Sequence, residues 1–173
     1  TYSGDKMLGG PQAGLLSGRE ALISRVRSNP LFRALRVDKL TYAALEATLM
    51  EYIRQNHDAI PFLRMLRMTA EEVRTRAEAL QKQLSSAAHL KTEIVSGESL
   101  VGGGSAPTST LPTFILAVTA DSLSADELAT RLRRHNPPIV ARVEEGRVLL
   151  DLRTVLSAAE DAEIARALIK TAA

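Results

Sequence analysis

The sequence of 173 residues contains no cysteine and no tryptophan, and only 3% of its residues are aromatic. The absence of cysteine excludes disulfide bonds, thiolate metal sites and a thiol nucleophile. With so few aromatic residues, a folded core must be built from the aliphatic side chains of Leu, Ile, Val and Ala. The three histidines, His57, His89 and His135, lie far apart in the sequence, so we expect no metal site.

The sequence also lacks an apolar run approaching the roughly 20 residues that cross a bilayer, and it has no recognisable signal peptide. Its 45% hydrophobic and 24% charged residues are ordinary for a globular protein, and the length suits one domain or one and a half. The net charge of +2 indicates no partner by itself. Residues 1–40, however, carry an excess of Lys and Arg that favours an anion or polyanion, although a solvated helix face explains Arg25 and Arg27 better.

Hydrophobic periodicity, capping motifs and turn residues predict the order of elements along the chain. The capping boxes begin at Thr69 and Ser124, and a hairpin turn is expected at residues 144–146. The expected elements are a strand over 13–17, helices over 19–27 and 40–53, an apolar connector over 60–66, a helix over 69–88, strands over 91–95 and 114–118, a helix over 124–134, a hairpin over 139–152 and a helix over 160–170. From about residue 67 onward, this order predicts a small α/β domain with an antiparallel sheet.

The most informative segment is residues 3–14, which read SGDKMLGGPQAG. Here Lys6 is surrounded by small and turn-forming residues, so it is either a solvated loop residue or an amine kept accessible for covalent chemistry. A free lysine has a pKa of about 10.4, so keeping it neutral near pH 7 costs roughly 4–5 kcal/mol. An enzyme avoids this cost by storing the lysine as an imine with a bound aldehyde. The spacing alone leaves both interpretations open, and the solvated loop is the commoner case.

The residues themselves favour the chemical interpretation, because residues 3–14 closely resemble the cofactor-lysine segment of the bacterial selenocysteine synthases, the L-seryl-tRNA(Sec) selenium transferases. The resemblance continues in the expected order through residues 30–39, 43–49, 60–66, 101–105, 111–112, 138–143 and 149–154. A match over nearly the whole chain is more specific than any single motif. Residues 107–110, Pro-Thr-Ser-Thr, depart from the family, where Pro-Gly and an acidic residue are more typical.

The resemblance implies the fold and the domain organisation. Members of the family are pyridoxal-phosphate (PLP) enzymes of fold type I, similar to aspartate aminotransferase, and they are much longer than this chain. The chain is therefore expected to be the carboxy-terminal portion of such an enzyme. Residues 1–66 would be a remnant of the PLP-binding large domain with an interdomain helix, and residues 67–173 the small α/β domain. The family also implies a cytoplasmic location and self-association as a dimer or a ring of dimers.

The resemblance also implies the reaction. The full-length enzyme converts seryl-tRNA(Sec) to selenocysteinyl-tRNA(Sec) through a PLP-bound dehydroalanyl intermediate, to which selenium from selenophosphate adds. Lys6 would form the imine with PLP and move protons, and Asp5 would adjust its protonation or contact the substrate, although Asp5 serves equally well as a turn cap. Ser3, Gly9 and Gly10 are the expected cofactor-binding residues. This chain alone is expected to be inactive and to bind tRNA poorly.

The family pattern further places an Arg-x-x-Arg pair, Arg33 and Arg36, at the active site, where it would bind the selenium donor. Residues three apart on a helical turn project from the same side, and arginine is suited to phosphate-like oxyanions. The alternative is an ion pair between subunits or domains, with Asp38 as a local candidate. Residues 102–104 lack the ending of a phosphate-binding loop and are expected to act as a hinge.

Two other functions stay open. A related PLP-dependent lyase acting on a small amino acid would carry a different residue beside the lysine and no Arg-x-x-Arg pair, so Asp5, Arg33 and Arg36 favour the synthase. A catalytically silent fragment that survives as a small-domain and dimerisation module is not excluded by any residue. The basic cluster Arg131, Arg133 and Arg134 lacks the aromatic residues that would accompany a tRNA-binding surface.

Overall fold

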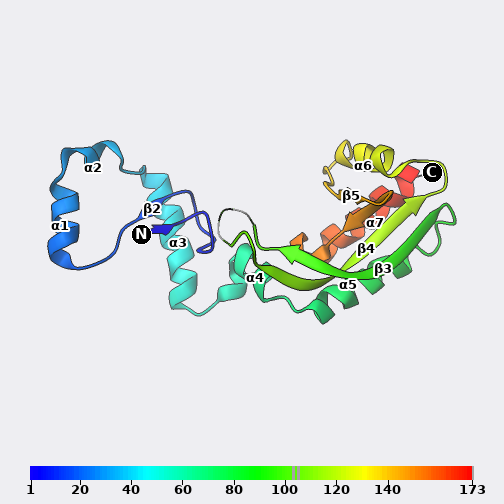
Figure 1. Cartoon of the computed structure of the whole chain (residues 1–173), viewed down its shortest axis with the longest axis horizontal. Coiled ribbons are helices and arrows are strands. Elements are labelled where there is room, and N and C mark those ends of the chain that lie inside the picture. The colour runs from blue at the N-terminus through cyan, green and yellow to red at the C-terminus, as the bar shows by residue number, and fades with distance from the viewer. Residues whose placement is uncertain (103, 105, 173) are drawn as a thin grey trace. The chain divides into compact units, whose positions relative to one another are not determined.

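A computed structural model of the chain describes residues 1–102, 104 and 106–172. It consists of two compact units, Thr1–Arg67 (unit 1) and Met68–Ala173 (unit 2), each of which is described by itself (Figure 1). Within the described residues, no helix is long and apolar enough to cross a membrane. Gly103 of the expected hinge lies outside the described residues, as does the neighbouring Ser105.

Unit 2 is built on a four-stranded antiparallel sheet, which confirms the predicted α/β character. The strand order is β3-β4-β6-β5, with β3 at Leu90–Leu100, β4 at Thr110–Ala120, β5 at Arg142–Glu144 and β6 at Arg147–Leu150. Strands β3 and β4 are longer than predicted because they pair in register from Leu90↔Ala120 to Leu100↔Thr110. Cross-strand hydrogen bonds extend both strands beyond the apolar segments that the sequence pattern detects.

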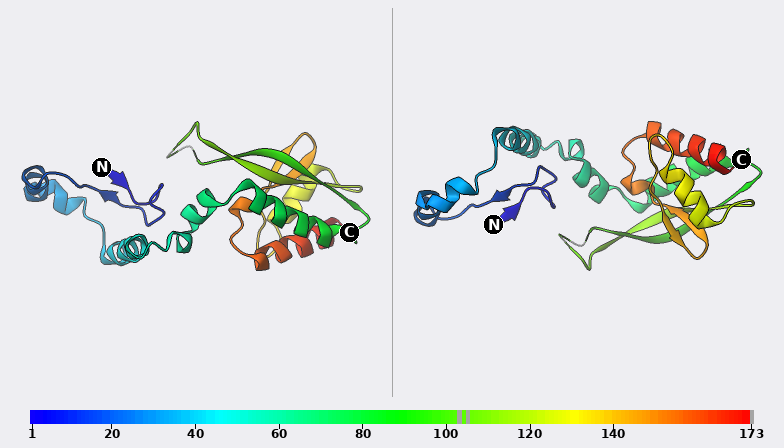
Figure 2. Two further views of the ribbon diagram at one scale, coloured as in Figure 1. Left: turned by 90° about the horizontal axis from the view of Figure 1, so that it is seen from below. Right: turned by 90° about the horizontal axis from the view of Figure 1, so that it is seen from above.

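Three helices cover one face of this sheet: α5 (Ala70–Leu84), α6 (Ala125–Arg133) and α7 (Ala158–Ala172). Figure 2 shows α5 and α7 running along the same side of β3 and β4. The core between the helices and the sheet is aliphatic, as the composition predicts. Its fully buried large side chains are Val73, Leu80, Leu84, Leu116, Val118, Leu128, Leu132, Val148, Leu152 and Leu168. Unit 2 is therefore a two-layer α/β domain with its own hydrophobic core.

The local motifs of unit 2 form largely as predicted. At α5 the capping box is complete, because Thr69 Oγ1 accepts from the Glu72 N–H and the Glu72 carboxylate accepts from the Thr69 N–H. At α6, within the described residues, only the Ser124 half of the box forms. The hairpin turns at Glu145–Gly146 as expected. Its first strand covers only residues 142–144, because Ile139 is buried but does not pair with β6.

Unit 1 contains a minimal hairpin and a series of helices. These are β1 (Tyr2–Ser3), β2 (Gly14–Leu15), α1 (Glu20–Ser28), α2 (Pro30–Ala34), α3 (Lys39–Ile53), η1 (His57–Ala59) and α4 (Pro61–Arg67). Helix α1 ends at Ser28, close to the predicted end at residue 27, and the short helix α2 then begins with Asn29 as its cap. The predicted connector over 60–66 is helix α4. Helices α2 and α4 both begin at a proline, whose missing N–H costs nothing at the first helical position.

Unit 1 has almost no core of its own. Among its described residues only Ala13 and Ile60 are buried hydrophobic side chains. Helix α3 has no buried residue, although apolar side chains lie on all its sides. The large hydrophobic side chains exposed in unit 1 are Tyr2, Met7, Leu16, Leu22, Val26, Leu31, Phe32, Leu35, Leu40, Tyr42, Leu49, Met50 and Ile53.

Candidate functional site

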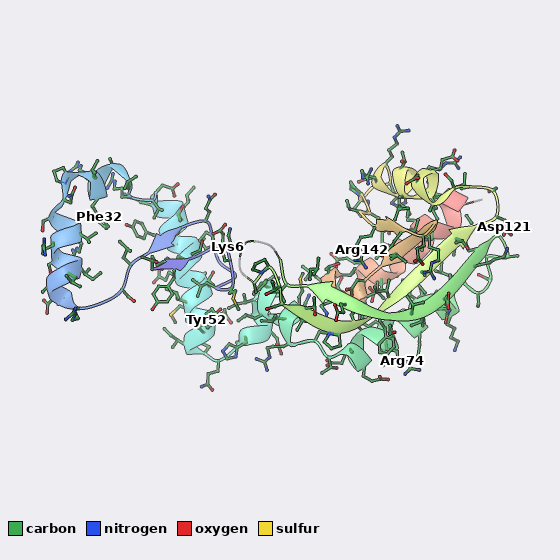
Figure 3. All side chains as sticks on the ribbon, in the orientation of Figure 1. Lys6, Phe32, Tyr52, Arg74, Asp121 and Arg142 are labelled. Carbon is green, nitrogen blue, oxygen red and sulfur yellow. The ribbon has the colours of Figure 1, made fainter. Side chains whose placement is uncertain are left out.

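The candidate site is the loop that carries Lys6 between β1 and β2 (Figure 3). Two ladder pairs, Tyr2↔Leu15 and Ser3↔Gly14, bring the ends of this loop together. The loop is closed further by backbone hydrogen bonds from Gly4 N to Ala13 O and from Gly10 N to Gly4 O, both 2.8 Å long. The resulting loop, residues 4–13, is referred to below as the lysine loop.

Two glycines are required by the path of the lysine loop. Gly9 has a φ of 73°, and a Cβ there would lie 2.5 Å from Ile60 Cγ2. A Cβ on the buried Gly4 would lie 2.3 Å from Pro11 O. At Gly4 a side chain would force the backbone to move, because the obstructing atom is a backbone oxygen. At Gly9 the positive φ and the Ile60 side chain both disfavour a side chain. The glycine content of this segment is thus explained by the close packing of the loop.

Within the lysine loop, the side chains of Ser3, Asp5 and Lys6 form one hydrogen-bonded group. Lys6 Nζ donates to Asp5 Oδ2 at 2.7 Å, and Ser3 Oγ donates to Asp5 Oδ1 at 2.7 Å. These hydrogen bonds, that of Lys6 first and that of Ser3 second, lower the pKa of Asp5 below its usual range. The Lys6 side chain is 43% exposed, so its amine can be reached from solvent. The arrangement presents an accessible amine beside a carboxylate that is ionised at neutral pH.

Helix α3 and the start of α4 support the far side of the lysine loop. Tyr52 Oη donates to Leu8 O at 3.0 Å, across 44 positions of sequence. Thr48 Oγ1 lies 3.1 Å from where a Cβ of Gly10 would be, and Ile60 lies against Gly9. The sequence places Thr48 and Tyr52 only within a helix expected over 40–53, and no local pattern signals the Tyr52 contact because its partner is a distant backbone carbonyl.

The arginine pair lies at the end of α2. Arg33 is in the last turn of this helix, which ends at Ala34, and Arg36 follows outside any helix or strand. The common side expected of the two side chains stays a prediction. Both arginines are exposed, and in the described part of the chain neither pairs with a carboxylate. Asp38, the expected alternative partner, instead caps α3 by accepting from the Thr41 N–H at 2.8 Å.

A second polar cluster lies buried in unit 2. The guanidinium of Arg153, only 4% exposed, donates from Nε to Ser99 Oγ at 3.0 Å and from an Nη to Pro112 O at 2.7 Å. Its other Nη donates to Met68 O, and Ser99 in turn donates to Asp151. These bonds join both long strands to the segment that starts α5, so we assign the cluster a structural role.

Other groups considered from the sequence are not assembled into a site. Across residues 1–102, 104 and 106–172, no group of His, Asp and Glu side chains could hold a metal ion. In the basic cluster, Arg131 donates to Thr171 O at 3.2 Å and lies 3.7 Å from the Glu127 carboxylate. That arginine is therefore engaged in holding α6 to the end of α7.

The chain is similar to known proteins along most of its length. The family model described as SelA, L-seryl-tRNA selenium transferase, matches residues 1–156. Curated relatives carrying the name L-seryl-tRNA(Sec) selenium transferase include proteins from Geobacter sulfurreducens, 48% identical over 160 residues, and Aquifex aeolicus, 45% identical over 153 residues. A relative of the same name from Moorella thermoacetica is 44% identical over 174 residues.

These matches cover most of this chain but only part of each relative. The aligned regions cover 90%, 88% and 98% of this chain for the Geobacter, Aquifex and Moorella relatives, but 35%, 34% and 37% of those proteins. The chain therefore spans about a third of the length of the curated relatives that it matches.

Proposed function

The chain belongs to the L-seryl-tRNA selenium transferase family, and we propose that it supplies the reactive lysine and the small domain of an enzyme that makes selenocysteinyl-tRNA(Sec) from seryl-tRNA(Sec). The proposed selenium donor is selenophosphate and the proposed cofactor is PLP, held through Lys6. The observation that carries the proposal is the lysine loop, in which an exposed amine lies 2.7 Å from an ionised carboxylate. The rest of the catalytic machinery would come from the part of the family's polypeptide that this chain does not span.

The residues of the lysine loop fit a cofactor that bears an aldehyde. The amine of Lys6 is accessible, and Gly4 and Gly9 keep side chains away from the backbone that carries it. PLP, when bound, supplies an electron sink for loss of the seryl hydroxyl and for addition of selenium. Ser3 is proposed as a cofactor-binding residue too, but its hydroxyl donates to Asp5, so it must leave this bond before it donates to a phosphate.

Asp5 and Lys6 have complementary parts in proton transfer. Because the pKa of Asp5 is lowered, Asp5 is a carboxylate at neutral pH and accepts the hydrogen bond that Lys6 Nζ donates. When Lys6 Nζ is neutral, it can take a proton from the substrate α-carbon and return one, as a general base and then a general acid. Asp5 then lies within hydrogen-bond reach of the proton that Lys6 carries.

Arg33 and Arg36 are proposed to bind the selenium donor. Both guanidinium groups are exposed, and within the described residues no carboxylate neutralises them. Asp38 is already used as the cap of α3. A fixed positive charge with several donors suits the oxyanion of selenophosphate. Since α2 ends before Arg36, we expect the two side chains to converge when the anion binds.

The domain assignment and self-association are likewise proposals. We assign residues 1–66 to the PLP-binding large domain of a fold-type I transferase and residues 67–173 to its small domain, which agrees with the two units meeting at Arg67 and Met68. The exposed apolar side chains of α1, α2 and α3 support contact with further polypeptide, either from the same enzyme or from a second subunit.

The proposed function is tested with a chimera, in which this chain replaces the matching third of the Aquifex aeolicus relative. The conversion of seryl-tRNA(Sec) to selenocysteinyl-tRNA(Sec) by this chimera is then measured. We expect the chimera to be active, and Lys6→Ala to lower its activity by at least about a hundredfold. Borohydride reduction in the presence of PLP is expected to label Lys6. Lys39→Ala, which removes a different lysine of unit 1, is the matched control and is expected to retain activity.

The arginine pair is tested separately in the same chimera. Arg33→Gln and Arg36→Gln are expected to raise the KM for selenophosphate and to leave the KM for seryl-tRNA(Sec) unchanged. A folded chimera that forms no adduct at Lys6 and makes no product would contradict the proposal and favour the catalytically silent module.

A further inference from the structure

Tyr52 contacts the lysine loop from outside it. The residue lies in the last turn of α3, and its hydroxyl donates to Leu8 O at 3.0 Å. Leu8 belongs to the turn that follows Lys6, in which Gly9 N donates to Lys6 O at 2.9 Å. Since Lys6 O and Leu8 O are both held, the short segment from Lys6 to Gly9 is fixed at two of its four residues.

The surroundings of Tyr52 make this hydrogen bond specific. The ring is partly buried and meets the ring of His57 edge-on, with the two centroids 5.8 Å apart. Burial raises the pKa of Tyr52, so its hydroxyl stays protonated and acts as a donor over the physiological range. The adjoining contacts of Gly9 with Ile60 and of Gly10 with Thr48 come from the same side of the loop.

We propose that Tyr52 is a positioning residue for Lys6, which holds the lysine loop against α3 through Leu8 O and thereby sets the direction in which the amine is presented. This inference rests on the proposed function in one respect, namely that the amine of Lys6 binds the cofactor. The contact itself is independent of any cofactor. The role differs from that of Asp5. Asp5 accepts a hydrogen bond from the Lys6 amine itself, whereas Tyr52 donates a hydrogen bond to the backbone of the loop that carries Lys6.

The first test measures hydrogen–deuterium exchange of the peptide covering residues 4–12 in the full 173-residue chain. Tyr52→Phe removes only the hydroxyl, and we expect exchange of this peptide to rise about three- to tenfold, the range for loss of one net hydrogen bond. Tyr42→Phe on the same helix is the matched control, since Tyr42 is 55% exposed, and it is expected to leave the exchange unchanged. Equal exchange in both variants, or unprotected exchange in the parent chain, would overturn the proposal.

The second test separates positioning from a general loss of structure. After incubation with PLP and borohydride reduction, we expect the ratio of adduct at Lys6 to adduct at Lys39 to fall about three- to tenfold in Tyr52→Phe. The far-UV circular dichroism is expected to stay the same. A parallel change at both lysines would indicate unfolding of unit 1 and would contradict the positioning role.

The two tests also distinguish this inference from the proposed function. If the parent chain shows no preference for Lys6 over Lys39 but Tyr52→Phe still raises exchange in the lysine loop, the cofactor proposal fails while the contact with α3 stands. If Lys6 is labelled selectively to the same extent in the parent and in Tyr52→Phe, the cofactor proposal stands and the positioning role fails.

Discussion

The two units of this chain contain similar apolar residues but use them differently. In unit 2, helices α5, α6 and α7 bury their apolar stripes against one face of a sheet, so Leu116 and Leu168 are completely inaccessible to solvent. In unit 1, α3 is as apolar as a core helix, yet Leu40 is 83% exposed and Ile53 is 73% exposed. Unit 2 thus completes its own core, whereas unit 1 presents apolar surface that its own residues do not cover.

This difference bears on how each unit would contribute to the proposed enzyme. A helix that is apolar on all sides is typical of a position buried on several sides at once. We therefore expect α3 to be covered by other parts of the family's polypeptide, of which this chain spans about a third. The lysine loop lies in unit 1, so the candidate chemistry lies in the unit that depends most on additional contacts.

The largest expected effect comes from separating the units. Expressed alone, residues 68–173 are expected to unfold cooperatively on heating, because they retain a complete aliphatic core. Residues 1–67 alone are expected to show no cooperative transition and to bind a hydrophobic dye. Calorimetry and dye fluorescence on the two pieces check this prediction, and a cooperative transition in residues 1–67 would remove the contrast between the units.

A smaller effect is expected from truncating one leucine in each unit. Leu116→Ala empties a fully buried position of unit 2, and we expect it to lower the free energy of unfolding by about 2–5 kcal/mol. Leu40→Ala in unit 1 changes an exposed side chain and is expected to alter the stability by less than about 0.5 kcal/mol. Urea denaturation followed by circular dichroism measures both, and similar losses would show that unit 1 buries Leu40 in solution.

The smallest effect is expected at the start of unit 2. Thr69→Ala removes the cap of α5 and is expected to cost about 1 kcal/mol, measured by urea denaturation of residues 68–173. The Thr69 hydroxyl, and then the Thr69 backbone N–H, lower the pKa of Glu72 by hydrogen bonding to its carboxylate. The contribution of Glu72 is therefore present above its unfolded pKa of about 4.3 and is lost as the pH falls through its lower folded pKa.

The variant provides its own control for this pH dependence. In Thr69→Ala, the stability of residues 68–173 is expected to vary less between pH 5 and pH 3 than in the parent, because part of the interaction that lowers the pKa of Glu72 is gone. An identical pH profile in both proteins would mean that the capping box does not form in solution.

Much of the fold was predictable because the signals are local. The Thr69 box, the Glu145–Gly146 turn and the apolar stripe of α5 each involve residues within a few positions of one another. The two short helices α2 and α4 were not among the expected elements, since each begins at a proline, a residue that was not interpreted as the start of a helix. The lengths of β3 and β4 were underestimated because strand pairing, not side-chain pattern, sets where these strands end.

The candidate site was predictable to a similar extent. The sequence around Lys6 identified the loop. The structure joins the side chains of Ser3, Asp5 and Lys6 by hydrogen bonds, which their closeness in the sequence makes easy to anticipate. The expected shared face of Arg33 and Arg36 stays a prediction, because helix α2 ends at Ala34, between the two residues. Tyr52 carried no signal as a contact of the loop, since its partner lies 44 residues away.

By itself, the sequence determined the aliphatic core, the glycine-bordered lysine, the helix caps and the family to which the chain belongs. These properties depend on composition and on interactions between residues close together in the chain. Only the tertiary structure decided that Leu116 is buried while Leu40 is exposed, that Arg153 is enclosed by the carbonyls of distant segments, and that Tyr52 holds the lysine loop. Burial and long-range hydrogen bonds depend on which surfaces pack together after folding. A local sequence pattern does not predict contacts between segments that lie far apart in the chain.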